Sequence, residues 1–145
     1  MALKKQKSSL TESDIQIKVS QYIKEKYPDV IFTFDASGLR LPIGYAMKIK
    51  KMRSSNGIPD LLVFEPKMNY NGLFIELKKD GVKIYKKDHT FASEHYEEQF
   101  NVIEDLRKKG YCAMFAFGLA EAKAIIDFYL DDSIPDYDIE RTFAL

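Results

Sequence analysis

Two short motifs contain the residues of this sequence that are best suited to bind a cation. Asp60 ends the segment 57–60 (Gly-Ile-Pro-Asp), and sixteen positions later Glu76 precedes Leu77 and Lys78. Side chains two positions apart on a strand share a face, so Glu76 and Lys78 are expected to point together, away from Leu77. If the two segments pair as a hairpin, Asp60 lies near Glu76. An open pair of carboxylates predicts a Mg²⁺ site, and the ammonium of Lys78 would stabilise charge on a phosphate.

Three elements are predicted before the first motif. A capping-box-like start at Thr11 begins a helix that Pro28 ends. The β-branched and aromatic run 30–34 predicts a strand. Residues 39–57 contain proline, glycine and a turn cluster, so they form either a long basic loop or a loop with a short helix around 46–52.

The first motif comes directly before a predicted strand at 61–64, and the second lies within a predicted strand at 73–78. The turn residues between the two strands predict an antiparallel hairpin. The apolar spacing over 93–109 predicts a helix, residues 111–117 a strand, and 119–130 a final helix. A strand, helix, strand crossover implies that the third and fourth strands are parallel. The predicted order is therefore α, β, β, β, α, β, α.

The composition is typical of one folded domain, predicted to cover residues 1–145 with a flexible basic N-terminus at 1–10. The chain has 145 residues, of which 46% are hydrophobic, and its formal net charge is zero. The single cysteine, Cys112, excludes an internal disulfide, and with His89 and His95 it cannot form an ordinary structural zinc site. We expect both histidines to be neutral surface residues and Cys112 to lie in the core. No export signal or membrane span is expected.

Charge is distributed unevenly along the chain. Two basic segments follow one another, and a later segment, 124–140, is acidic and has no lysine or arginine. The cations of the basic segments are Arg40, Lys48, Lys50, Lys51, Arg53, Lys78, Lys79, Lys83, Lys86 and Lys87. Such an asymmetry suits a polyanionic partner on one face, although charge runs are also typical of solvated loops and helix faces.

The motifs occur in a characteristic order. A helix with Glu12 precedes Gly-Ile-Pro-Asp at 57–60, which is followed by Glu-Leu-Lys at 76–78 and by Gln99 on a later helix. Alone, a Glu-x-Lys pair is commonly a solvated ion pair, and Pro-Asp is commonly a turn. In this order the pattern resembles the PD-(D/E)XK nuclease superfamily, and these segments, with Glu98, are similar to its VRR-NUC branch over nearly the whole chain.

The resemblance implies an α/β fold with a restriction-endonuclease-like core, in which helices flank a mixed central sheet of about four strands in the order αβββαβα. It also implies a DNA phosphodiesterase that depends on Mg²⁺, with Mn²⁺ as the expected substitute. Asp60 and Glu76 would then be metal ligands, with the carbonyl of Leu77 completing the shell. Lys78 would position or help to activate the attacking water, and Gln99 would be the polar residue that a helix brings to the site.

Members of the family usually carry an acid on the first helix, and two acids qualify here. Helical spacing places Glu12 with Val19 and Ile23 on the inward side, whereas Asp14 lies on the outward polar stripe. Glu12 is therefore expected at the site and Asp14 as the cap. The alternative is that Glu12 only complements the helix dipole.

The basic segments supply the expected DNA contacts, which are Arg40, Lys48, Lys50, Lys51, Arg53, Lys79 and Lys83. The Val-Arg-Arg motif that names the branch is not spelled out here, and residues 47–53 stand in its place. They predict phosphate contacts without base reading, or else an exposed amphipathic turn. Tyr45, Tyr70 and Tyr85 either pack on sugars and bases or are half-buried strand residues.

The favoured function is a small DNA endonuclease, with selectivity for branched DNA or Holliday junctions as the finer expectation. A homodimer is expected because symmetrical cutting of two strands needs two active sites. The alternatives are a noncatalytic nucleic-acid-binding module that retains the nuclease fold, and a metal-dependent enzyme that acts on nucleotides. The basic segments disfavour the latter. A cytoplasmic location and a prokaryotic or viral origin are expected.

Overall fold

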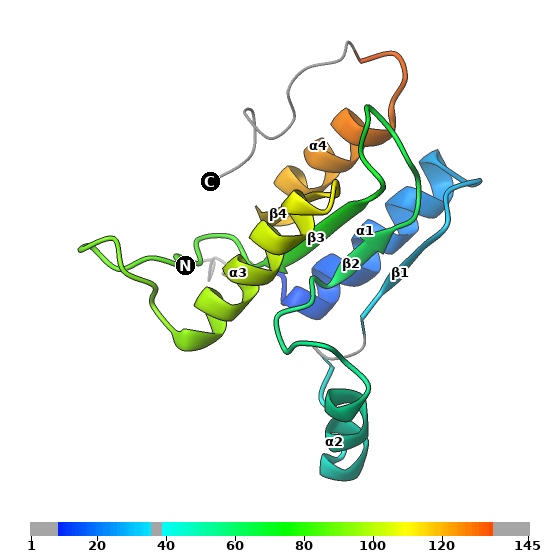
Figure 1. Cartoon of the computed structure of the whole chain (residues 1–145). Coiled ribbons are helices and arrows are strands. Elements are labelled where there is room, and N and C mark those ends of the chain that lie inside the picture. Colours follow the sequence, from blue (N-terminus) through cyan, green and yellow to red (C-terminus); the bar gives the residue numbers. More distant parts are fainter. Residues whose placement is uncertain (1–8, 36–38, 135–145) are drawn as a thin grey trace, which may run out of the picture.

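The computed structural model of the chain describes residues 9–35 and 39–134. In this part of the chain a four-stranded sheet has the order β1-β2-β3-β4 (Figure 1). The strands are β1 (Phe32–Phe34), β2 (Leu61–Val63), β3 (Leu73–Lys78) and β4 (Cys112–Phe117). β2 pairs antiparallel with both β1 and β3, while β3 and β4 are parallel. The predicted hairpin and the predicted parallel crossover are confirmed.

The helices are α1 (Glu12–Lys26), α2 (Ile43–Lys51), α3 (Glu94–Lys108) and α4 (Leu119–Leu130). The order is therefore αβαββαβα, which is the predicted order with α2 added. Helix α2 lies in the segment 39–57 that sequence alone left open between a loop and a loop with a helix. It begins three residues before the expected 46–52, because the carbonyl of Pro42 already accepts hydrogen bonds from Tyr45 and Ala46.

Three predicted strands are shorter in the structure: the strand predicted at 61–64 ends at Val63, and two others start later because their first N–H groups are used elsewhere. In the strand expected at 30–34, the N–H of Val30 donates to the carbonyl of Tyr27 in the turn after α1. The N–H of Tyr111 donates to the carbonyl of Leu106 at the end of α3. An N–H that closes a turn or helix end cannot join a strand ladder, so pairing starts one or two residues later.

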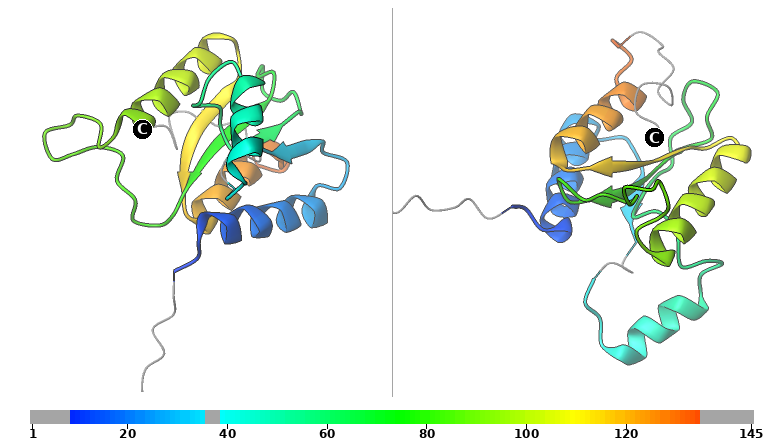
Figure 2. Two further views of the ribbon diagram at one scale, coloured as in Figure 1. Left: turned by 90° about the horizontal axis from the view of Figure 1, so that it is seen from below. Right: turned by 90° about the vertical axis from the view of Figure 1, so that its left-hand side faces the viewer.

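The alternation of side chains along β3 separates two apolar clusters on opposite faces of the sheet. Leu73, Ile75 and Leu77 pack in the larger cluster, which includes buried residues of α1 and α4. Phe74 packs on the other face in a smaller cluster with Ile103 of α3. Figure 2 shows the helices on the two sides of the sheet. The even-numbered residues of β3, Glu76 and Lys78 among them, therefore face α3.

Helix α1 has the expected cap and the expected buried face. The N–H of Asp14 donates to the hydroxyl of Thr11 at 3.1 Å, and the carboxylate of Asp14 accepts from the N–H of Thr11 at 3.0 Å. Ile15, Val19 and Ile23 are buried. This capping box orients the start of α1, so that the residue after Thr11 can reach the edge of the sheet.

Helix α2 extends away from the rest of the fold (Figure 1), and none of its residues is buried. Within residues 9–35 and 39–134, no helix has both the length and the apolar character needed to cross a bilayer. Most of the predicted basic N-terminus at 1–10 lies outside the described residues. The same is true of three acids of the segment 124–140, which are Asp136, Asp138 and Glu140.

Candidate active site

Four buried polar side chains meet on the face of the sheet that α3 covers. They are Asp60, Glu76, Lys78 and Gln99, each at most 7% exposed, and they are the buried polar or charged residues of the part that the structure describes. The carboxylate pair is less exposed than the open pair that the sequence suggested, because α3 and the neighbouring strands cover most of both side chains. Burying several polar groups at one place costs folding free energy, which is typical of a functional site.

The hairpin brings the two carboxylates together. Leu61, the first residue of β2, pairs with Ile75 of β3, so Asp60 lies beside Glu76. Oδ2 of Asp60 accepts a hydrogen bond from the N–H of Leu77 at 2.9 Å. This bond extends the antiparallel pairing by a side-chain contact and holds the Asp60 carboxylate at the edge of β3.

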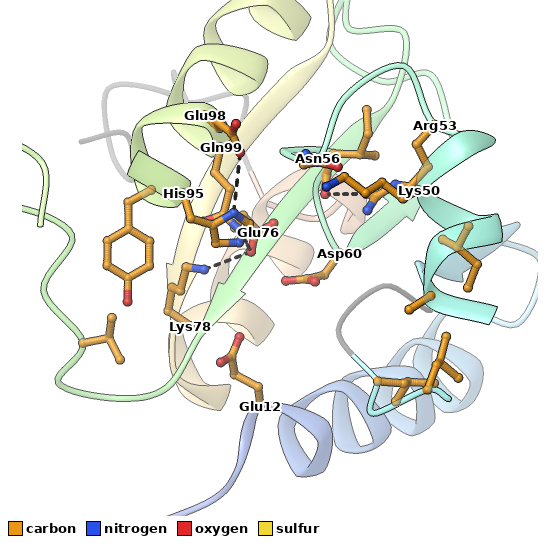
Figure 3. A pocket seen from close by; sticks show the side chains of 17 residues that line it. Glu12, Lys50, Arg53, Asn56, Asp60, Glu76, Lys78, His95, Glu98 and Gln99 are labelled. Carbon is orange, nitrogen blue, oxygen red and sulfur yellow. Dashed lines mark hydrogen bonds and ion pairs between the residues drawn. The ribbon is translucent and has the colours of Figure 1, made fainter. Parts of the chain in front are cut away.

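Lys78 and Gln99 both donate to the same oxygen of Glu76. The Lys78 ammonium lies 3.0 Å from Glu76 Oε1, and Gln99 Nε2 lies 2.6 Å from it (Figure 3). Lys78 Nζ also lies 5.0 Å from the centre of the Tyr96 ring. The cluster is therefore held in one arrangement by three elements: β3, the first two turns of α3, and the loop before β2.

The glycine of the first motif allows α3 to approach the cluster closely. A Cβ atom on Gly57 would lie 2.7 Å from the carbonyl oxygen of Glu98 and 3.0 Å from the N of Gln99. Such contacts are too short for any side chain, so only glycine lets the backbone before Asp60 pack on the backbone of α3. The glycine thus helps to place Gln99 against Glu76.

The electrostatic environment opposes ionisation of the two carboxyl groups. Burial raises the pKa of Asp60, and the charge of Glu12 adds to this effect, while the N–H of Leu77 and the charge of Lys78 oppose it. Burial also raises the pKa of Glu76 well above its ordinary value, and the charge of Asp60 raises it further. One lysine does not compensate two buried carboxylates, so the cluster favours an additional positive charge.

A cavity of about 570 Å³ opens over the cluster, and its size is typical of a ligand site. Glu12 at the start of α1 lines the cavity, and its side chain points toward Asp60 and Lys78 (Figure 3). Asp14 does not line it, because its carboxylate caps α1. The structure therefore brings Glu12 to the site and leaves Asp14 outside.

One carboxylate oxygen in the cluster has no partner. Glu76 Oε2 is buried and makes no hydrogen bond, as is also true of Gln99 Oε1. Among the described residues, no group of three or more acidic, histidine or cysteine side chains is arranged as a metal site. Two carboxylates with one free buried oxygen suit Mg²⁺, which binds few protein ligands and keeps several waters. The residues present therefore fit such an ion.

The backbone of Leu77 faces the same edge as Asp60. The carbonyl of Lys78 accepts from the N–H of Gly118, on the side of β4. Because consecutive peptide groups of a strand alternate in direction, the N–H and carbonyl of Leu77 leave β3 on the opposite side. The N–H already donates to Asp60 there. The carbonyl is thus placed where the ligand role implied for it is feasible.

Of the seven residues expected to contact DNA, Lys50 and Arg53 line this cavity, and the others are not part of its lining. Lys48, Lys50 and Lys51 are exposed on α2, and Lys50 lines the cavity. Arg53 also lines it, but its guanidinium forms an ion pair with Asp35 at 2.5 Å. The remaining three positions belong to loops, where Arg40 and Lys83 are exposed and Lys79 is half-buried.

Sequence reasoning missed the role of His95 in the site. It is exposed, as expected of a surface histidine, yet its Nε2 lies 3.1 Å from Gln99 Nε2, and it lines the cavity. Its other ring nitrogen, Nδ1, lies 3.8 Å from a carboxylate oxygen of Glu98. The spacing of four residues between His95 and Gln99 on one helix was the available signal. His89, in contrast, lies in an exposed turn with a positive φ of 68°.

Comparison with known proteins identifies a related structure. A solved structure described as a "VRR_NUC domain protein" is similar to this chain with a TM-score of 0.57 and 29% sequence identity, covering 84% of this chain and 89% of the other. No family model matches the sequence, and no curated protein matches it. The structural similarity confirms the resemblance that the motifs suggested and the restriction-endonuclease-like α/β fold.

Proposed function

We propose that this chain, a VRR-NUC domain of the PD-(D/E)XK nuclease superfamily, is a metal-dependent DNA endonuclease. The observation that carries the proposal is the free buried oxygen of Glu76, next to Asp60 and Lys78 at the floor of a cavity. A noncatalytic module would have no need to bury two carboxylates whose charges destabilise each other.

Asp60, Glu76 and the carbonyl of Leu77 are the residues that would hold Mg²⁺, or Mn²⁺ in its place. When bound, such an ion would neutralise charge on the phosphate and lower the pKa of a water molecule. Asp60 is held by the N–H of Leu77, and Glu76 keeps Oε2 free because Oε1 accepts both donors of the cluster. The protein thus orients both ligands before the ion binds.

Lys78 would orient the attacking water and stabilise the negative charge that develops on the phosphate. In the reaction, the water oxygen forms a bond to phosphorus, one ester P–O bond breaks, and the products are a phosphate monoester and a hydroxyl. Gln99 would position Glu76 through its hydrogen bond of 2.6 Å. Glu12 reaches the cavity from α1 and would act as an acceptor for the protons of bound water.

DNA binding is supported by the cations of the two basic segments, of which Lys50, Arg53 and Lys78 line the cavity. We extend the proposal to branched DNA, including Holliday junctions, and to a homodimer. The homodimer is proposed because symmetrical cutting of a junction requires two active sites related by a two-fold axis. Sedimentation of the purified protein with and without a four-way junction would measure this stoichiometry.

The test of the proposal is cleavage of supercoiled plasmid by the purified protein. We expect nicked and linear products with Mg²⁺ or Mn²⁺, none with EDTA, and none with the Asp60→Asn variant, which should still retain DNA on a filter. Retention of DNA without cleavage by the wild type in either metal would support the noncatalytic binding module. Cleavage that persists in Asp60→Asn would show that the activity belongs to another site or protein.

A further inference from the structure

Helix α2 exposes large apolar side chains that no described part of the chain covers. Ile43 is 80% exposed, Met47 is 55% exposed, and Tyr45 and Met52, the residue that follows the helix, are also exposed. A free helix of nine residues would gain nothing from these side chains in water. An exposed apolar group of this kind on a protruding element is typical of an interaction surface.

The apolar pair lies at the rim of the candidate active site. Ile43 and Met47 are one helical turn apart and therefore share a face of α2. Ala46 and Lys50, on the adjacent face, line the cavity above the carboxylate cluster. Any molecule that binds in the cavity and extends along α2 meets the apolar pair next.

The charges around the pair indicate that its partner is anionic. Residues 39–59 contain no aspartate or glutamate. In the part of the chain that the structure describes, Lys48, Lys50 and Lys51 form no ion pair. A second copy of the chain placed with its own α2 on this helix would bring like charges together, which disfavours self-association here. A nucleic acid satisfies both requirements, since it presents phosphates and apolar base faces.

We propose that α2 is a wedge for branched DNA, in which Ile43 and Met47 pack against bases that lack a stacking partner while the lysines bind the flanking phosphates. This inference rests on the proposed function and assigns to α2 the recognition of the branched substrate proposed there. A continuous duplex offers phosphates to the lysines but no free base face to the apolar pair. Apolar side chains that enter between bases are an established way to bind distorted DNA.

The test compares wild type with the double variant Ile43→Gln and Met47→Gln, without metal, so that no cleavage is required. Probes are a four-way junction with 2-aminopurine at the branch point and a linear duplex of equal length. We expect binding of wild type to raise the 2-aminopurine fluorescence. The variant should bind the junction roughly tenfold more weakly and lose the fluorescence rise, with a change of less than about twofold on the duplex.

The matched control is Ile17→Gln, an apolar residue on α1 that is 59% exposed, and thermal melts verify that all variants are folded. Equal losses on junction and duplex, or no fluorescence rise with wild type, would overturn the wedge. A change in sedimentation from dimer to monomer in the double variant would also overturn it and assign the face to a second copy. Because these readouts need no cleavage, failure of the nuclease proposal appears separately, as absence of products from wild type in Mg²⁺.

Discussion

The carboxylate cluster and helix α2 border the same cavity, but they are built in opposite ways. Each side chain of the cluster is at most 7% exposed and is held by hydrogen bonds of 2.6 to 3.0 Å. Helix α2 has no buried residue, and its three lysines form no ion pair in the described part of the chain. Chemistry on a phosphate requires fixed groups in a partly dry site, whereas binding of a DNA backbone requires solvated cations that can adjust.

Because the cluster is buried and helix α2 is exposed, substitutions in the two regions should affect stability and function differently. Burying the charged groups of the cluster costs folding free energy. Substitution of these residues should therefore change both the free energy of unfolding and the rate of cleavage. Helix α2 has no fully buried residue, so substitutions of its exposed side chains should change affinity and leave stability almost unaltered.

Replacement of either carboxylate should remove cleavage almost completely. We expect Asp60→Asn and Glu76→Gln each to lower the single-turnover rate by roughly 1,000-fold or more, because each removes a proposed ligand of the metal. Affinity for DNA should change by less than about threefold, since neither residue is among the proposed phosphate contacts. A large loss of affinity with an unchanged rate would reverse the assignment of the two regions.

Lys78→Met should lower cleavage by roughly 100- to 1,000-fold while Mn²⁺ still binds, because the ammonium is proposed to act on water and phosphate and not as a ligand. Isothermal titration calorimetry measures the metal affinity. Lys18→Met, at an exposed position of α1, is the matched control and should leave both quantities unchanged. Loss of Mn²⁺ binding in a folded Lys78→Met protein would make Lys78 part of the metal site.

Neutralising α2 should change the salt dependence of DNA binding. In the triple variant Lys48→Gln, Lys50→Gln and Lys51→Gln, the slope of log affinity against log salt should fall by about 2 to 3 units, because each phosphate contact contributes about 0.9. Fluorescence anisotropy between about 50 and 200 mM salt, a range over which the Debye length shortens, gives the slope. Arg53 is left intact because Asp35 already pairs with it. An unchanged slope would show that α2 does not contact phosphates.

Gly57→Ala should destabilise the fold by roughly 1–3 kcal/mol, because the added methyl would collide with the backbone of α3. Gly44 on α2 provides the matched control, since a Cβ atom there meets nothing within 4 Å. Gly44→Ala should be neutral or stabilising by up to about 1 kcal/mol, as helix interiors favour alanine. Urea unfolding of both variants measures the difference. Equal stabilities would contradict the proposed close approach of segment 57–60 to α3.

Asp60→Asn should stabilise the metal-free protein at pH 8 by roughly 1–3 kcal/mol, because it removes a buried charge that Leu77 and Lys78 compensate only in part. The folded-state pKa of Asp60 is raised above 3.8, so the fold favours its neutral form. The stabilisation from neutral Asp60 is fully present below the pKa of Asp60 in the unfolded chain. It is lost as the pH rises through the raised pKa of Asp60 in the folded protein. The advantage of the variant should therefore disappear toward acid pH. Unfolding in urea with EDTA at several pH values tests this sign.

Much of the fold was predictable because its signals are local. Alternation along β3 places Glu76 and Lys78 together, and the salt bridge of 3.0 Å between them agrees with that placement. The bounds of β3 and α4 coincide with the predicted 73–78 and 119–130. The pairing of β2 with β3 followed from a short connection, which leaves few other arrangements for two apolar strands.

The sequence by itself therefore determined which residue types face the same side of each element, because periodicity within a strand or helix depends only on neighbours along the chain. Only the tertiary structure decided which of these faces meet. It placed Gln99 on Glu76 across 23 residues, paired Arg53 with Asp35, and brought His95 to the cavity. It also buried the carboxylates and left α2 exposed, since burial is set by packing between elements that are distant in sequence.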